Sequence, residues 1–230
     1  MNDCDVIVVG AGPSGSEAAW ALARRGLRVG LVTDSLDSVY RLETPVDSPP
    51  RGGLLARVWS ADTWELHRRA KYALEAEETL RLFQSSVTGL LHGGGRVTGV
   101  KTWEGFSYRA GAVVLAVGSF LGAVLRAGAL EEAAGRLGEA AYPDLYEHLR
   151  GLGFAFEPDS YLVPESDGAP AYTVSFQRFA PGEREEASGG LLRLPGLYAV
   201  GRVALGHTPA PVRAASGRAL GEVLVPGGSG

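Results

Sequence analysis

The fold of this chain is decided by residues 5–15, which read DVIVVGAGPSG. The apolar, mostly β-branched start of this stretch is typical of a strand buried on both faces. The Ala- and Leu-rich segment Glu17–Arg25, followed by Gly26, predicts a helix, and the apolar run Leu27–Thr33 predicts a second strand. A strand, a helix and a strand in this order predict a βαβ unit with a right-handed crossover.

The glycines of this stretch match the pattern G-x-G-x-x-G directly after a strand and at the start of a helix. Gly10 permits the tight turn, Gly12 lets the backbone approach a diphosphate, and Gly15 allows the helix to pack closely on the strand. The free N–H groups and the positive dipole end of the helix would then hold the phosphate charge. The alternative is a plain strand-to-helix turn, because the chain has 33 glycines. The matching context on both sides favours a dinucleotide site.

An acidic residue stands at the end of the second strand, about 20 residues after the last glycine, as this motif requires. It is Asp34, and Thr33 precedes it. Either side chain could bond a ribose hydroxyl, and a carboxylate there disfavours a 2′-phosphate. We therefore expect an adenosine ribose without a 2′-phosphate; the alternative is that Asp34 is only a turn residue.

The composition excludes several classes of protein. With 230 residues, 45% of them hydrophobic, the chain suits one large domain or two small ones and is not disordered. Its single cysteine cannot form an internal disulfide. The net charge of −4 gives no general attraction to nucleic acid. We find neither a basic leader nor an apolar run long enough to span a membrane, and therefore expect a cytoplasmic protein.

Beyond the βαβ unit, residues 34–60 predict a long irregular connection. The other predicted elements are a helix at Ala61–Glu77, a strand that begins at Leu80–Gln84 and continues through Val87–Leu91, meander strands at Val97–Thr102 and Phe106–Ala110, buried strands at Ala112–Val117 and Gly196–Val200, and helices at Pro143–Leu152 and Pro211–Val225. We predict one domain over residues 1–225, with residues 119–190 as a short irregular insertion and residues 226–230 as a tail.

This layout predicts an α/β fold, a three-layer Rossmann-like FAD/NAD(P)-binding domain of the glutathione-reductase type with a small antiparallel β-meander. A nicotinamide enzyme usually continues with more βα units, whereas this chain continues through the long loop, a helix and the meander. An NAD-binding dehydrogenase therefore stays only as an alternative.

The same segments resemble the flavin domain of the glucose-inhibited division protein A (GidA/MnmG) family, the FAD-dependent proteins that modify the tRNA wobble uridine. The resemblance is carried, in one collinear order, by residues 6–19, 31–37, 83–87, 109–121 and 195–201. It implies FAD as cofactor, flavin-dependent oxidoreduction and a link to tRNA modification, with tRNA or a protein as further partner.

The resemblance also implies roles for single residues. The FAD diphosphate would lie at Gly10, Gly12, Pro13, Ser14 and Gly15, and the adenosine ribose near Thr33 and Asp34. The remaining contacts implied are Ser86 and Val87 at the adenine edge, Ala116 and Gly118 along the middle of the cofactor, Gly201 and Arg202 at the ribityl–diphosphate stretch, Val212 at the helix start that faces the flavin ring, and Gly53 of a double glycine.

Two departures from the family limit what the resemblance implies. The family has a cysteine in the loop after the second strand, whereas residues 41–46 contain no thiol and Cys4 lies at the start of the first strand. The family also has a larger insertion and a helical C-terminal domain. These departures favour the alternative of a non-catalytic flavin-binding module that acts through a partner protein.

The remaining candidate groups carry weaker signals. His207 would lie near the flavin if Gly201 does, either as a proton donor or as a solvated loop residue. The other histidines share no metal-ligand spacing, so we predict no metal site. Arginines of the long loop, among them Arg41, could meet phosphate, although such residues are usually only solvated.

Overall fold

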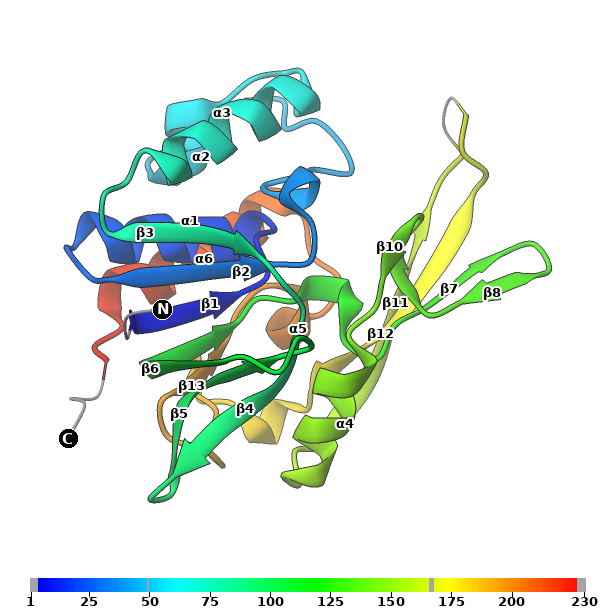
Figure 1. Ribbon diagram of the computed structural model, residues 1–230. Coiled ribbons are helices and arrows are strands. Elements are labelled where there is room, and N and C mark those ends of the chain that lie inside the picture. Colours follow the sequence, from blue (N-terminus) through cyan, green and yellow to red (C-terminus); the bar gives the residue numbers. More distant parts are fainter. Residues whose placement is uncertain (1–3, 49, 166–167, 227–230) are drawn as a thin grey trace.

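The structure is a computed structural model that describes residues 4–48, 50–165 and 168–226. Its main body is built on one seven-stranded sheet, and an arm of β-strands extends away from this body (Figure 1). The strands of the main sheet are β1 (Cys4–Val9), β2 (Val29–Thr33), β3 (Leu80–Gln84), β4 (Val87–Gly93), β5 (Arg96–Thr102), β6 (Ser107–Leu115) and β13 (Leu197–Ala199). Their order is β3-β2-β1-β6-β5-β4, with β13 paired to β6.

The predicted βαβ unit is present, with β1 parallel to both β2 and β6. Helix α1 (Pro13–Arg24) begins earlier than the predicted Glu17, because Gly12 is extended and Pro13 suits the first helical position. The helix is followed by Gly26, whose φ of 81° lies in the left-handed region.

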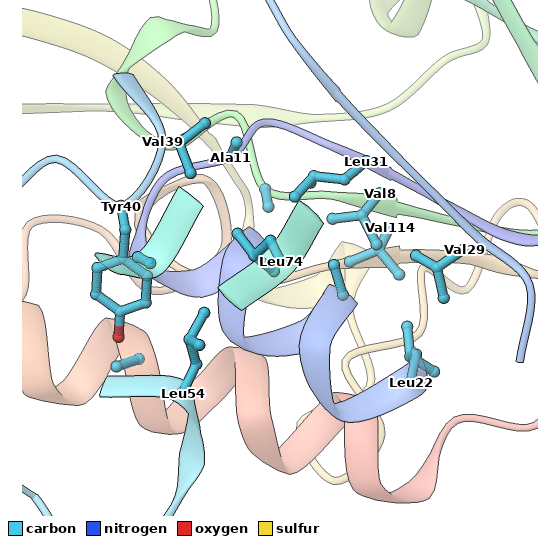
Figure 2. Close-up of a cluster of buried hydrophobic side chains, with 14 of the residues drawn as sticks. Val8, Ala11, Leu22, Val29, Leu31, Val39, Tyr40, Leu54, Leu74 and Val114 are labelled. Atoms are coloured by element: carbon cyan, nitrogen blue, oxygen red, sulfur yellow. The ribbon is translucent and has the colours of Figure 1, made fainter. Parts of the chain in front are cut away.

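The continuous apolar run of β1 is explained by burial on both of its faces. Val6 and Val8 pack with α1, α2 (Gly53–Val58), α3 (Thr63–Glu75) and α6 (Ala210–Val223). Figure 2 shows part of this cluster, in which Leu22 and Leu74 of the helices accompany Val8 and Leu31 of the sheet. Ile7 and Val9 belong to the second cluster, with side chains of the meander and of α4 (Pro143–Gly151). The predicted three-layer α/β fold with its meander is therefore confirmed.

Two strand predictions are wrong in their boundaries. The run from Leu80 to Leu91 is not one strand, because β3 pairs in parallel with β2 and β4 pairs antiparallel with β5. The chain changes direction at Ser85, whose hydroxyl donates to Glu104. Conversely, the meander strand and the buried strand predicted at residues 106–117 form the single strand β6, whose first half pairs with β5 and whose second half pairs with β1 and β13.

The connection over residues 34–60 contains more regular structure than predicted. It holds the short 3₁₀ helix η1 (Leu36–Ser38) and helix α2. Glu17 on α1 accepts hydrogen bonds from the backbone N–H groups of Leu54 and Leu55 and from the hydroxyl of Tyr40. This buried carboxylate therefore caps the start of α2 from another helix, a contact that no local sequence pattern reveals.

The segment 119–190, predicted to be irregular, is instead mostly regular. Its elements are η2 (Gly118–Phe120), β7 (Val124–Ala127), β8 (Leu130–Glu132), β9 (Ala134–Arg136), β10 (Glu139–Ala140), α4, β11 (Phe156–Val163), β12 (Tyr172–Phe179) and η3 (Pro181–Glu183). Strands β11, β12, β7 and β8 form the sheet of the arm, with a core that includes Tyr161, Val174 and Phe176. The side chains of β12 alternate between buried and partly exposed, a strand signal that the Pro-, Gly- and Glu-rich composition of the neighbouring segments outweighed in the prediction.

The last elements of the chain are the short helix α5 (Arg202–Leu205) and α6, which begins one residue before the predicted Pro211. The predicted tail lies outside the described residues except for Pro226. No helix within the described ranges has both the length and the apolar character needed to cross a membrane.

Candidate functional site

A cavity of about 320 Å³ lies at the carboxyl ends of β1, β2 and β6. This is the edge at which parallel α/β sheets bind their ligands. The cavity is lined by Gly10, Ala11, Gly12, Pro13, Ser14, Thr33, Asp34, Ser35, Ser38, Arg41, Glu43, Ala116, Val117, Gly118, Ser119, Phe120, Arg136, Gly138, Glu139, Ala140, Tyr142, Arg202 and Arg213. The predicted glycine turn and the predicted ribose acid are thus brought to one site.

The glycine turn forms an open cradle at the start of α1. A Cβ atom on Gly15 would overlap the carbonyl oxygen of Gly10, so the helix approaches the turn as closely as the backbone allows. A Cβ on Gly12, in contrast, would meet no atom within 4 Å. No side chain caps the start of α1. The turn therefore leaves room and hydrogen-bond donors for an anion at the positive end of the helix.

Asp34, directly after β2, lines the same cavity as the glycine turn. Its Oδ1 atom is buried and has no hydrogen-bond partner. Burial raises the pKa of Asp34 to about 6, while the hydroxyl groups of Tyr142 and Ser86 oppose this shift. The hydroxyl of Thr33 is instead engaged within the loop, with the carbonyl oxygen of Ser35 at 3.1 Å. Asp34 is therefore the acceptor that a ligand hydroxyl would satisfy.

A cluster of charged side chains forms another part of the wall. Arg202 donates to both carboxylate oxygens of Glu43, at 2.5 and 2.6 Å, and Arg213 lies 3.4 Å from the same carboxylate. The side chain of Glu43 is only 20% exposed. Burial opposes ionisation of Glu43, yet the hydrogen bonds and charge of Arg202, followed by the charges of Arg213 and Arg136, lower its pKa to about 2. Glu43 is therefore a fixed negative charge and not a proton donor at neutral pH.

Tyr161 of the arm contacts this cluster. The guanidinium carbon of Arg202 lies 4.1 Å from the ring centre of Tyr161, and the ring of His207 stacks on Tyr161 at 4.8 Å. The backbone N–H of His207 donates to the carboxylate of Asp159, two residues before Tyr161. Burial, followed by the charge of Arg202, lowers the pKa of His207. His207 itself does not line the cavity.

The structure brings most, but not all, of the predicted site residues to the cavity wall. Those that line it are Gly10, Gly12, Pro13, Ser14, Thr33, Asp34, Ala116, Gly118 and Arg202, whereas Gly15, Gly53, Ser86, Val87, Gly201 and Val212 lie outside the lining. Gly15 packs under the turn, as its predicted role requires. Gly53 faces Glu17 at the start of α2, and Val212 is 47% exposed. Cofactor contacts at these outer positions stay predictions.

Several lining residues were missed by the sequence analysis. Glu43, Arg136, Glu139, Tyr142 and Arg213 belong to the long loop, the insertion and the last helix. Only tertiary folding brings these segments to the turn, and their local patterns carry no signal of it. Among the described residues, no group of three or more His, Cys, Asp and Glu side chains is placed to hold a metal ion.

Comparison with known protein families identifies the same family that the sequence resembles. The family model of glucose inhibited division protein A matches residues 5–45 and 50–158. The tRNA uridine 5-carboxymethylaminomethyl modification enzyme MnmG of Syntrophobacter fumaroxidans is 33% identical over 229 residues, which cover 81% of this chain and 34% of that enzyme. The enzyme of the same name from Thermus thermophilus is 34% identical over 187 residues, 66% of this chain and 31% of that enzyme. The chain thus spans about a third of the length of these curated relatives.

Solved structures extend the similarity over nearly the whole chain. A GidA-related protein from Thermus thermophilus is 48% identical, with a TM-score of 0.88 and coverage of 95% of this chain and 96% of that one. GidA of Aquifex aeolicus has a TM-score of 0.87 at 16% identity, over 96% of this chain and 65% of that one, which shows a shared fold.

Proposed function

Because this chain belongs to the glucose inhibited division protein A family, we propose that it binds FAD in the cavity beside β1, β2 and β6 and acts as a flavin-dependent oxidoreductase domain. The observation that carries this proposal is the open cradle at Gly12. There, free space lies directly over a helix start that no side chain caps. A diphosphate is the group that such a cradle accepts.

The residues of the site fit FAD in two further respects. The Oδ1 of Asp34 is buried without a partner and would accept a ribose hydroxyl, while its carboxylate would repel a 2′-phosphate. Arg202 is buried, and its positive charge would face the ribityl–diphosphate stretch in our proposal. We propose the cofactor contacts that were predicted from the sequence. Gly15 would contribute through its close packing against the glycine turn.

When bound, FAD would supply hydride transfer, which no side chain of this protein can perform. The protein would orient the cofactor through the amides of the turn and through Asp34. The positive end of α6 would stabilise negative charge that develops on the reduced ring system. Glu43, fixed in its ionised form, would hold Arg202 in place and would not exchange protons.

The place of this domain in tRNA modification is also a proposal, and it rests on family membership. The chain spans about a third of the length of these relatives, so an action on tRNA, or with a protein partner, is proposed for this chain only by analogy with them. A second candidate function is a flavin-binding module without catalysis of its own. It is favoured by the absence of a thiol in residues 41–46 and by the burial of Cys4, the one cysteine of the chain.

These two functions are distinguished by mixing the FAD-loaded protein with NADH or NADPH without oxygen. An oxidoreductase should bleach the flavin absorption band within seconds to minutes. An unchanged band with both donors, in a preparation that retains FAD, would instead support the non-catalytic module.

Asp34→Asn should weaken FAD binding by roughly 10- to 100-fold, because a hydrogen bond to a charged acceptor contributes about 1.5–3 kcal/mol. The pH dependence should follow the raised pKa of about 6. Protonation removes the charged acceptor, so the affinity of the wild type should fall as the pH drops through this value, and that of the Asp34→Asn variant should not. Fluorescence titration with FAD between pH 5 and pH 8 measures both. Parallel pH profiles for the two proteins would exclude Asp34 as the ribose acceptor.

A further inference from the structure

Arg213 lies at a position where its positive charge is unfavourable in the ligand-free protein. It is the fourth residue of α6, where the positive end of the helix disfavours a cation. It is only 8% exposed, and its Nε atom is buried without a hydrogen-bond partner. Its side chain nevertheless lines the cavity.

Two of the three carboxylates that line the cavity, those of Glu43 and Glu139, are already used by other arginines. Glu139 lies 3.1 Å from Arg136 and 3.6 Å from Arg41. Both oxygens of Glu43 accept from Arg202 at 2.5 and 2.6 Å, and the contact with Arg213 is much longer, at 3.4 Å. Arg213 and Arg41 therefore each share a carboxylate that a nearer arginine already uses. Of these two, Arg213 is the buried one, with a side chain that is 10% exposed against 38% for Arg41.

Other groups around Arg213 also disfavour its positive charge. Burial, followed by the neighbouring charge of Arg202, lowers the pKa of Arg213 in spite of Glu43. Arg136 acts in the same direction. A buried cation with unused donors costs free energy unless an anion completes it. Such a cost at a cavity wall is typical of a residue retained for binding.

We propose that Arg213, with Arg136 and Arg202 beside it, forms a subsite for an anionic group, a phosphate or a carboxylate, of a molecule held in this cavity. The subsite extends the proposed function by naming the ligand chemistry at this end of the site. It does not depend on FAD, because the anion can belong either to the cofactor's diphosphate or to a second molecule.

The test uses inorganic pyrophosphate as the probe, with titration calorimetry of the protein before and after loading with FAD. We expect Arg213→Gln to weaken pyrophosphate binding roughly tenfold or more. Arg213→Lys keeps the charge and should lose less. Arg126→Gln is the matched control, since Arg126 belongs to an exposed pair with Glu131 on the arm, and it should change nothing.

The two sources of the anion give different results. If FAD loading abolishes pyrophosphate binding and Arg213→Gln weakens FAD but not riboflavin, the subsite binds the cofactor's diphosphate. If the FAD-loaded protein still binds pyrophosphate through Arg213, the anion belongs to a second molecule. A protein that binds pyrophosphate but no FAD would refute the proposed function and leave the subsite standing.

Thermal unfolding separates this role from a structural one. Without ligand, Arg213→Gln should raise the melting temperature by about 2–4 °C, because it removes an unfavourable charge. A residue needed only to anchor Glu43 would lower it. Equal pyrophosphate binding by wild type and variant, or no binding by either, would overturn the proposal.

Discussion

Gly15→Ala should destabilise the protein by about 3 kcal/mol or more, or prevent it from folding, in spite of the roughly 1 kcal/mol by which alanine favours a helix. The new Cβ would overlap the carbonyl oxygen of Gly10 and would also lie only 3.0 Å from the Cβ of Ala116. Backbone atoms cannot rotate away, so α1 would have to move off the sheet. Urea denaturation followed by circular dichroism measures the loss.

Gly12→Ala is the control that separates stability from binding. The φ of −65° at Gly12 suits any residue, and a Cβ there would meet no protein atom within 4 Å. The stability should therefore change by less than about 1 kcal/mol. FAD affinity should fall roughly tenfold or more, because the methyl group would occupy the space in which we propose that the diphosphate binds. Equal stability losses in the two variants would contradict this assignment of the two glycines.

Glu43→Gln should lower the free energy of unfolding by about 3 kcal/mol at pH 7. The pKa of Glu43 falls from 4.5 to about 2 on folding, and each unit corresponds to about 1.4 kcal/mol. Removing one partner of a buried pair has a cost of this size, because it leaves Arg202 buried without its carboxylate. Glu131→Gln, in the exposed pair with Arg126, should cost less than about 1 kcal/mol.

The pH dependence of this loss has a definite sign. Glu43 is ionised more readily in the folded than in the unfolded protein, so its contribution is complete above pH 4.5 and is lost as the pH falls towards 2. The difference between wild type and Glu43→Gln should therefore shrink over this interval. A difference that stays constant down to pH 2 would show that the loss comes from packing and not from charge.

Much of the fold could be predicted because the decisive signals are local. The apolar run at Val6–Val9 indicates that β1 is buried on both faces. The glycines after it indicate that the backbone of α1 closely approaches the backbone of the turn. Asp34 could be found because its distance from the turn follows from the length of a βαβ unit. Arg202, which follows the glycine after the last buried strand, was predicted through the resemblance to the family and not from a local pattern.

The rest of the site could not be predicted, for physical reasons. Glu43 reaches Arg202 across 159 positions of the chain, and the hydroxyl of Tyr142 approaches Asp34 from the insertion. Such contacts depend on how an irregular loop and the arm fold onto the sheet. The strands of the arm were missed although Tyr172–Phe179 alternates between buried and partly exposed side chains, because the Pro-, Gly-, Ser- and Glu-rich composition of the segment around it was taken to indicate a loop.

The most direct test of the central claim is the absorption spectrum of the protein after incubation with FAD and removal of the unbound cofactor by gel filtration. We expect a flavin band that corresponds to one FAD per chain in the wild type and to markedly less in Gly12→Ala at the same protein concentration. A folded wild-type protein that retains no flavin would contradict the account.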